Sequence, residues 1–351
     1  MGATLTARHL RHLRGGREVL QIEELSVGAG QRLAVLGPNG SGKTTLLRLL
    51  AGIEAPTQGS VTLDGKATKA LPLSARRTIG YVTQQPSLLT TTVRRNIELP
   101  LAWRDLPRPL RQHRVLAALE RLGVAQLAER PASRLSSGER QRVNLARSLA
   151  MEPSVLLLDE PAAALDPEAR ATFLDDLDRA LAHQSTTVVH VSHRPEEAVR
   201  GADQVAVLDR GKVKQLSSPV EVFRHPVDTR VASIVGYHNL LPATVDGRGS
   251  VRLAGHVVAT APKHMEGAVT LAIWAHGVRI VRPDLGSLLA LVQSVTPGPG
   301  RWDITLCAHD SRLTAHQASE VTPPRQGEQV GVQLLPELTV VVLGGTAPVR
   351  G

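Results

Sequence analysis

The sequence contains a single cysteine and few aromatic residues. Among its 351 residues there are one Cys, three Trp, two Tyr and two Phe. Because Cys307 has no second cysteine to pair with, the chain cannot form an internal disulfide, and there is no cysteine cluster that could bind zinc. This composition fits a reducing compartment. The shares of hydrophobic (42%) and charged (21%) residues are ordinary for a globular protein.

Long apolar segments are also missing. No window holds 18 uninterrupted apolar residues, so no segment is expected to span a membrane alone. Arg8, Arg11 and Arg14 near the N-terminus are not followed by an apolar run, which is unlike a secretory signal. We therefore expect a soluble protein of the cytoplasm.

The positive charge of the chain is concentrated in its first two thirds. The formal net charge is +9; from Leu240 onward nine Lys/Arg face eight Asp/Glu, so the first 239 residues carry the other +8. Such an excess can favour a nucleotide, an anionic membrane surface or nucleic acid, although a solvated arginine-rich surface is the more common explanation.

The pattern of apolar residues predicts two domains. Up to residue 233, short apolar runs alternate with helical periods, and the stretch after Pro107 is almost purely helical, with Val115, Leu116, Leu119 and Leu122 on one face. After Ile234, short β-rich runs alternate with turn residues. We predict an α/β domain over residues 1–233, with a helical insert at about 86–150, and a small all-β barrel over residues 234–351.

A glycine-rich phosphate-binding motif occupies residues 37–44. Gly37-Pro38-Asn39-Gly40-Ser41-Gly42-Lys43-Thr44 fits G-x-x-x-x-G-K-[ST], with an apolar run before it and a leucine-rich helical period after it. Successive backbone N–H groups would converge there on an anion at a helix N-terminus. Lys43 would reach the β- and γ-phosphates, the Thr44 hydroxyl would hold Mg²⁺, and Thr45 completes the predicted nucleotide contacts.

Two adjacent carboxylates follow the apolar run at residues 155–158. Asp159 is placed to bind Mg²⁺ directly or through water, and Glu160 to polarise the water that attacks the γ-phosphate. Alone, such a pair would more often begin a helix. Together with the upstream phosphate loop, it predicts catalysis.

Four further segments make residues 1 to about 233 resemble ATP-binding-cassette (ABC) ATPases. Residues 135–142 (LSSGERQR) resemble the signature motif LSGGQ, and Gln84 resembles the Q-loop glutamine. Ala164-Leu165-Asp166 is similar to the D-loop, and His193 to the switch histidine. With the phosphate loop and the carboxylate pair, all six motifs stand in the order of that family.

The resemblance implies ATP and Mg²⁺ as cofactors and assigns further residues to the site. Gln84 would take part in catalysis and metal binding, and His193 in catalysis. Ser136, Gly138 and Asp166 would complete the nucleotide site of a second copy in a head-to-tail homodimer. Physical chemistry is consistent with this, because Ser136 opens an S-x-x-E capping box that leaves N–H groups free to face an anion.

The sequence departs from the family pattern in three places. Ser137-Gly138-Glu139 stands where Gly-Gly-Gln is common, and Ala163 where a serine is usual. The aromatic residue that usually stacks on adenine is missing; Arg14 could stack instead through its guanidinium plane.

The C-terminal third resembles the TOBE-type accessory domain of binding-protein-dependent importers. Residues 236–241, 278–283 and 327–330 carry the likeness, and residues 288–343 are similar to one molybdate-binding-type barrel unit. The resemblance implies uptake of molybdate or tungstate. Sulfate, polyamine and ferric-iron importers share the architecture and remain alternatives.

An importer ATPase would act with separate transmembrane permease subunits and a periplasmic or extracellular solute-binding protein, at the cytoplasmic face of the inner or plasma membrane. Residues 90–101 would then help to receive the permease.

Two other functions are possible: a non-transport ABC protein acting on nucleic acid, and a protein that stores or senses oxyanions. We expect no nucleic-acid partner, because after Tyr237 only Trp274 and Trp302 could stack on bases.

Overall fold

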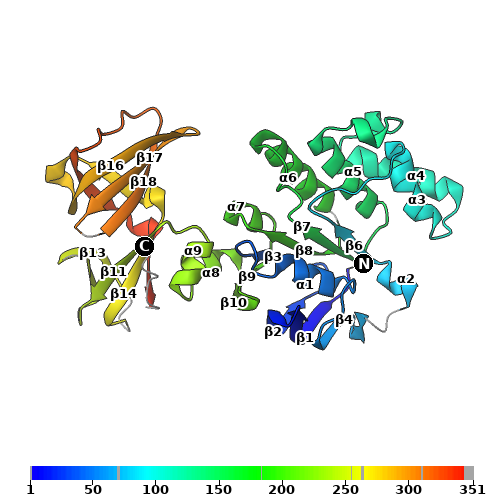
Figure 1. Cartoon of the computed structure of the whole chain (residues 1–351), viewed down its shortest axis with the longest axis horizontal. Coiled ribbons are helices and arrows are strands. Elements are labelled where there is room, and N and C mark those ends of the chain that lie inside the picture. Colours follow the sequence, from blue (N-terminus) through cyan, green and yellow to red (C-terminus); the bar gives the residue numbers. More distant parts are fainter. Residues whose placement is uncertain are drawn as a thin grey trace. The chain divides into compact units, whose positions relative to one another are not determined.

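The computed structural model describes residues 2–68, 72–182, 184–253, 255–261, 265–309 and 311–343. The chain forms two compact units that divide between Pro219 and Val220. Both are drawn in Figure 1.

The first unit contains two β-sheets. The larger has six strands in the order β10-β9-β3-β8-β7-β6, in which only β10 is antiparallel to its neighbour. The smaller is antiparallel, in the order β2-β1-β4-β5. Their strands are β1 (Leu5–Arg14), β2 (Arg17–Val27), β3 (Arg32–Leu36), β4 (Gln58–Leu63), β5 (Lys66–Ala67), β6 (Ile79–Val82), β7 (Val155–Asp159), β8 (Thr187–Ser192), β9 (Gln204–Asp209) and β10 (Lys212–Ser217).

The helices of this unit are α1 (Lys43–Leu50), α2 (Leu73–Arg76), α3 (Val93–Ala102), α4 (Arg108–Arg121), α5 (Ser137–Leu149), α6 (Pro167–Leu181) and α7 (Pro195–Ala198). None of the helices in the described ranges is both long and apolar enough to cross a bilayer.

On α4, Val115, Leu119 and the following Leu122 are buried as predicted, but Leu116 is 48% exposed. That part of the prediction was wrong, because a step of one residue turns the side chain by about 100° around the helix.

Both faces of the larger sheet are covered, which explains its continuous apolar strands. On β7, Val155 and Leu157 pack in the core that includes α1 and the smaller sheet. Leu156 and Leu158 point the other way, into the core formed with α5 and α6. On β7 the polar residue, Asp159, is therefore at the strand end, where the site described below lies.

The second unit is all-β apart from short helices, as the sequence predicted. Apolar side chains from two antiparallel sheets, β13-β12-β11-β14-β20 and β15-β19-β16-β17-β18, share one core. The elements are α8 (Pro219–Arg224), α9 (Thr229–Ile234), β11 (Asn239–Val245), β12 (Ser250–Leu253), β13 (His256–Thr260), β14 (Gly267–Ile273), β15 (Val278–Val281), β16 (Leu288–Gly298), β17 (Arg301–Ala308), β18 (Ser311–Ala318), β19 (Gln329–Leu334) and β20 (Thr339–Leu343).

The boundary between the two units lies at residue 219, whereas the sequence pattern placed it at residue 233. The boundary is earlier because aromatic contacts join α8 to the β-rich part of the second unit. The ring of Phe223 lies nearly parallel to that of Trp274, with centroids 6.3 Å apart. Tyr237 packs against the same tryptophan, and its hydroxyl donates to the carbonyl of Phe223 at 2.8 Å. The second unit thus includes α8 from Val220 onward, and α9.

Candidate functional site

The phosphate loop connects β3 to α1, the arrangement that the sequence predicted. Gly42 precedes α1 with a φ of +106°, and a Cβ there would lie 2.8 Å from the Leu20 side chain. Glycine is therefore required at this position on both conformational and steric grounds. Ser41 is buried, and its hydroxyl has no hydrogen-bond partner among the described residues. An unpaired polar atom at a helix N-terminus fits a loop that binds phosphate oxygens.

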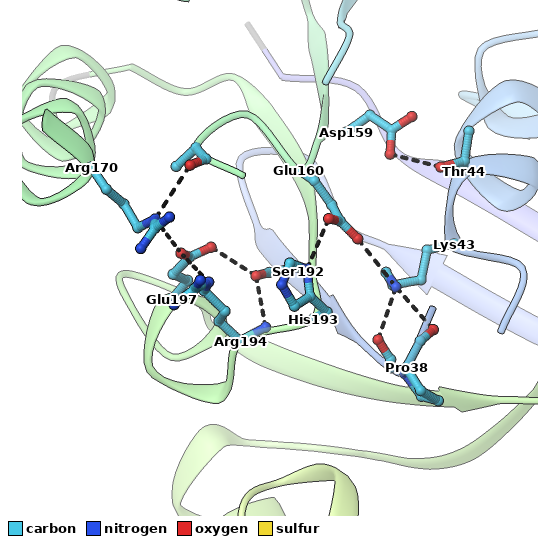
Figure 2. A network of polar contacts seen from close by, with 12 residues as sticks. Pro38, Lys43, Thr44, Asp159, Glu160, Arg170, Ser192, His193, Arg194 and Glu197 are labelled. Carbon is cyan, nitrogen blue, oxygen red and sulfur yellow. Dashed lines mark hydrogen bonds and ion pairs between the residues drawn. The ribbon is translucent and has the colours of Figure 1, made fainter. Parts of the chain in front are cut away.

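The Lys43 ammonium group lies inside this loop. Its Nζ donates to the carbonyls of Gly37 (2.8 Å) and Pro38 (3.1 Å) and lies 3.3 Å from Oε1 of Glu160. Figure 2 shows Lys43 between Pro38 and Glu160. The side chain is only 5% exposed. The site therefore has a buried positive charge where the motif predicts phosphates.

Asp159, at the end of β7, accepts two hydrogen bonds. The Thr44 hydroxyl donates to Oδ1 (3.0 Å), and the Tyr81 hydroxyl donates to Oδ2 (2.8 Å). Burial raises the pKa of Asp159 above its ordinary value, and the two hydrogen bonds offset part of this shift. A hydroxyl and a carboxylate at this distance are oxygen donors of the kind that Mg²⁺ prefers. Sequence reasoning placed Thr44 and Asp159 here but missed Tyr81.

Replacing Tyr81 with phenylalanine should raise the Mg²⁺ concentration needed for half-maximal ATP hydrolysis about tenfold, because residues that orient metal ligands contribute about 10–100-fold to metal affinity. At saturating Mg²⁺ the rate should return to near the wild-type value. Tyr237→Phe, which removes a hydrogen-bonded hydroxyl from the second unit, is the matched control. An unchanged Mg²⁺ dependence in Tyr81→Phe would show that the contact does not orient Asp159.

Glu160 lies between Lys43 and His193. Its Oε2 is 2.8 Å from Nδ1 of His193, and its side chain is 12% exposed. The residue has a φ of +43°, a left-handed conformation that is unfavourable for glutamate by about 1–3 kcal/mol. Its backbone N–H donates to the carbonyl of Val191 on β8 at 3.2 Å, which helps to hold this conformation. Backbone strain of this kind is typical of functional sites.

The other predicted residues lie outside this cluster. Ser136 caps α5 and forms the predicted capping box with Glu139, and Asp166 caps α6. Gly138 is buried at the start of α5, whereas Gln84 is exposed in the segment after β6. Within the described part of the chain, none of these predicted residues hydrogen-bonds to Lys43, Asp159 or Glu160. One copy of the chain thus brings together Lys43, Thr44, Asp159, Glu160 and His193.

Arg14, the predicted substitute for an adenine-stacking aromatic, is held in a fixed orientation. Its Nη2 donates to both carboxylate oxygens of Glu54, each at 2.9 Å, and Arg48 donates to the same carboxylate. Although burial raises the pKa of Glu54, the hydrogen bonds from Arg14 and Arg48 hold it below its ordinary value. The guanidinium is half exposed. Stacking of a base on it stays a prediction.

Sequence reasoning also missed a network on the far side of His193. Arg170 on α6 and Glu197 on α7 contact each other and the loops that carry Glu160 and His193. No local motif marks these residues, because tertiary packing brings them together.

Comparison with known proteins places these observations in a family. The model of the protein family described as "ABC transporter" matches residues 20–163 of the chain. The chain is 36% identical, over 94% of its length and 97% of the relative's, to the sulfate/thiosulfate import ATP-binding protein CysA of Bradyrhizobium diazoefficiens. It is 36% identical to the Fe(3+) ions import ATP-binding protein FbpC of Streptomyces coelicolor, over 95% of this chain and 94% of the relative. It is 37% identical to the spermidine/putrescine import ATP-binding protein PotA of Ruegeria pomeroyi, over 81% of this chain and 80% of the relative.

Two solved structures are similar to the chain. One is cbiO1 from Clostridium perfringens, part of the ABC transporter complex cbiONQ (TM-score 0.59, 30% identity, 67% of this chain and 95% of that chain). The other is the dimeric ATP-binding cassette MJ0796 bound to ADP and Pi (TM-score 0.55, 28% identity, 61% and 98%).

The chain has the phosphate loop and the carboxylate pair of an ATP-hydrolysing protein. Together with the similarity to these relatives, this shows that it belongs to the ABC transporter ATPases. Within that family, it is the ATP-binding subunit of an import system.

Proposed function

We propose that Glu160 activates the water molecule that attacks the γ-phosphate of ATP. The observation that carries this proposal is the position of its carboxylate, 3.3 Å from Lys43 Nζ and 2.8 Å from His193 Nδ1. A carboxylate at a strand end, next to the phosphate loop, can accept a proton from water while the cation holds the phosphates. His193 would orient the carboxylate and contact the γ-phosphate when ATP is bound.

Thr44 and Asp159 are the residues that would hold Mg²⁺, with Gln84 as a further ligand and catalytic residue from the neighbouring loop. When bound, Mg²⁺ neutralises charge on the phosphate oxygens. Thr45 and the backbone N–H groups of residues 37–44, apart from Pro38, which has none, would bind the phosphates at the start of α1.

We propose that two copies of the chain form the complete ATPase. Ser136, Gly138 and Asp166 lie apart from the cluster of their own chain, and they are placed to contact the nucleotide of the other copy. The capped start of α5 supports this, because its free N–H groups favour an anion. The similarity to a dimeric cassette bound to ADP and Pi is consistent with the arrangement.

For the solute, we propose a tetrahedral oxyanion, with sulfate or thiosulfate ahead of molybdate and tungstate. The sequence favoured molybdate, but the relatives described above are named for sulfate/thiosulfate, ferric ion and spermidine/putrescine import. The sulfate/thiosulfate relative is matched over both units of the chain. Ferric ion is the second candidate, because a relative of that name is matched over a similar length.

Transport would require separate permease subunits and a periplasmic or extracellular solute-binding protein, with the ATPase on the cytoplasmic face of the membrane.

Deletion of the gene should lower uptake of labelled sulfate at least about tenfold, while spermidine and ferric-ion uptake stay unchanged. Complementation with the wild-type chain should restore uptake, and complementation with Glu160→Gln should not. Loss of ferric-ion or spermidine uptake alone would contradict the oxyanion assignment.

A further inference from the structure

Two loops carry the residues around the proposed water site. One loop begins at Glu160 and runs to residue 166, and the other, residues 192–194, begins at the last residue of β8 and contains His193. Glu160 and His193 form a direct contact between the two loops. A second connection runs behind it through Arg170 and Glu197 (Figure 2).

Arg170 fixes the loop that follows Glu160. Its Nε donates to the carbonyl of Ala162 (3.3 Å), and its Nη2 donates to the carbonyl of Leu165 (2.5 Å). The same Nε lies 3.6 Å from Oε1 of Glu197, and the two side chains are only 15% and 5% exposed. A buried guanidinium that donates to two carbonyls holds the loop in place, and its positive charge lies beside the Glu197 carboxylate.

Glu197 in turn fixes the loop of His193. Its Oε2 accepts a hydrogen bond from the Ser192 hydroxyl at 2.8 Å. The same hydroxyl accepts from the backbone N–H of Arg194 at 3.0 Å, so it closes the turn that has His193 at its centre. Ser192 and Glu197 are both almost fully buried, which leaves water little access to replace these contacts.

We infer that Arg170 and Glu197 are positioning residues for hydrolysis. They hold the turn around His193 in a fixed position relative to the loop that begins at Glu160. This inference rests on the proposed function of Glu160 and His193. Glu197 Oε1 lies 3.6 Å from Nε of both Arg170 and Arg194 and makes no hydrogen bond among the described residues. A small rotation would complete a bond to either guanidinium.

The test uses steady-state hydrolysis and nucleotide binding by the full-length chain. Arg170→Met and Glu197→Gln should each lower kcat about tenfold or more, because small misplacements of catalytic groups cost up to about 100-fold. The KM for ATP should stay within about twofold. Arg114→Met is the matched control: its guanidinium is also mostly buried (20% exposed), but it pairs with Glu152, away from both loops. It should leave kcat unchanged.

Amide hydrogen exchange gives a readout that does not depend on turnover. In Arg170→Met, exchange should accelerate in residues 162–166 and 192–194 but not in β3 or β9. Should this variant fail to fold, Arg170→Lys keeps the charge but cannot donate to two carbonyls through a planar fork, and it should show the same pattern more weakly.

Wild-type kcat in both Arg170→Met and Glu197→Gln, with Glu160→Gln inactive, would overturn the inference and leave the proposed function standing. Unchanged exchange in the two loops would also overturn it. Wild-type turnover by Glu160→Gln would instead overturn the proposed function, and the inference with it.

Discussion

Replacing Glu160 with glutamine is expected to lower kcat for ATP hydrolysis at least about 100-fold, while the affinity for ATP changes little. A general base typically contributes about 10²–10⁴-fold to the rate, and it acts in the transition state rather than in binding. The amide keeps the size of the side chain and can still contact His193, but it cannot accept the proton from water. Lys43 and the loop that binds the phosphates are unchanged.

The experiment compares turnover with equilibrium nucleotide binding and with sedimentation in ATP-Mg²⁺. The variant should bind ATP and accumulate as a dimer with trapped nucleotide. Glu196→Gln is a suitable control, because it removes an exposed carboxylate (70% exposed) a few residues beyond His193. Wild-type turnover by Glu160→Gln would contradict the assigned role. A monomer in the presence of ATP would contradict the proposed dimer.

Replacing Lys43 with alanine should weaken ATP binding itself, by about 10- to 150-fold. This range corresponds to the loss of about 1.5–3 kcal/mol that is typical for hydrogen bonds to charged groups. The ammonium is 5% exposed and is the cation closest to Glu160 in the site. Its removal also leaves that carboxylate without its positive partner, next to the place where negative phosphates bind.

Titration with a fluorescent ATP analogue measures this effect directly. Lys66→Ala, which removes an exposed lysine from β5, controls for the change in net charge. If Lys43→Ala bound the analogue with wild-type affinity and failed only in turnover, the lysine would act in the transition state alone, contrary to the proposal.

The sequence was sufficient to predict that Lys43, Asp159, Glu160 and His193 lie close together, because these residues stand at or just beyond the ends of parallel strands. β3, β8 and β7 are adjacent in the sheet, so the phosphate loop, His193 and the carboxylate pair meet at one edge. Each position is fixed by a short motif next to an apolar run, and neighbouring parallel strands end at the same side.

The smaller sheet of the first unit was not predicted, for a local reason. On β1, Leu5 and Ala7 face the core, but the alternation shifts before Leu10. His9 there has a φ of +48°, and the pairing of β1 with β4 is irregular at this point. A bulge of this kind breaks the period of two by which a strand is recognised in sequence.

Contacts between distant side chains were also beyond prediction. The Tyr81 hydroxyl reaches Asp159 from the neighbouring strand β6, and Arg170 reaches Glu197 from a different helix. Their residue types are common in strands and helices, so nothing in the local sequence distinguishes them from ordinary core or surface positions.

The aromatic contacts of α8 determine where the chain can be cut without damage. A fragment that begins at residue 234 would lack Phe223, which lies against Trp274, and the carbonyl that accepts the Tyr237 hydroxyl. The indole would then be exposed on one side, and its fluorescence would report a more polar environment. Any genetic or proteolytic separation that preserves the β-rich unit must therefore be made on the N-terminal side of α8, whose first residue is Pro219.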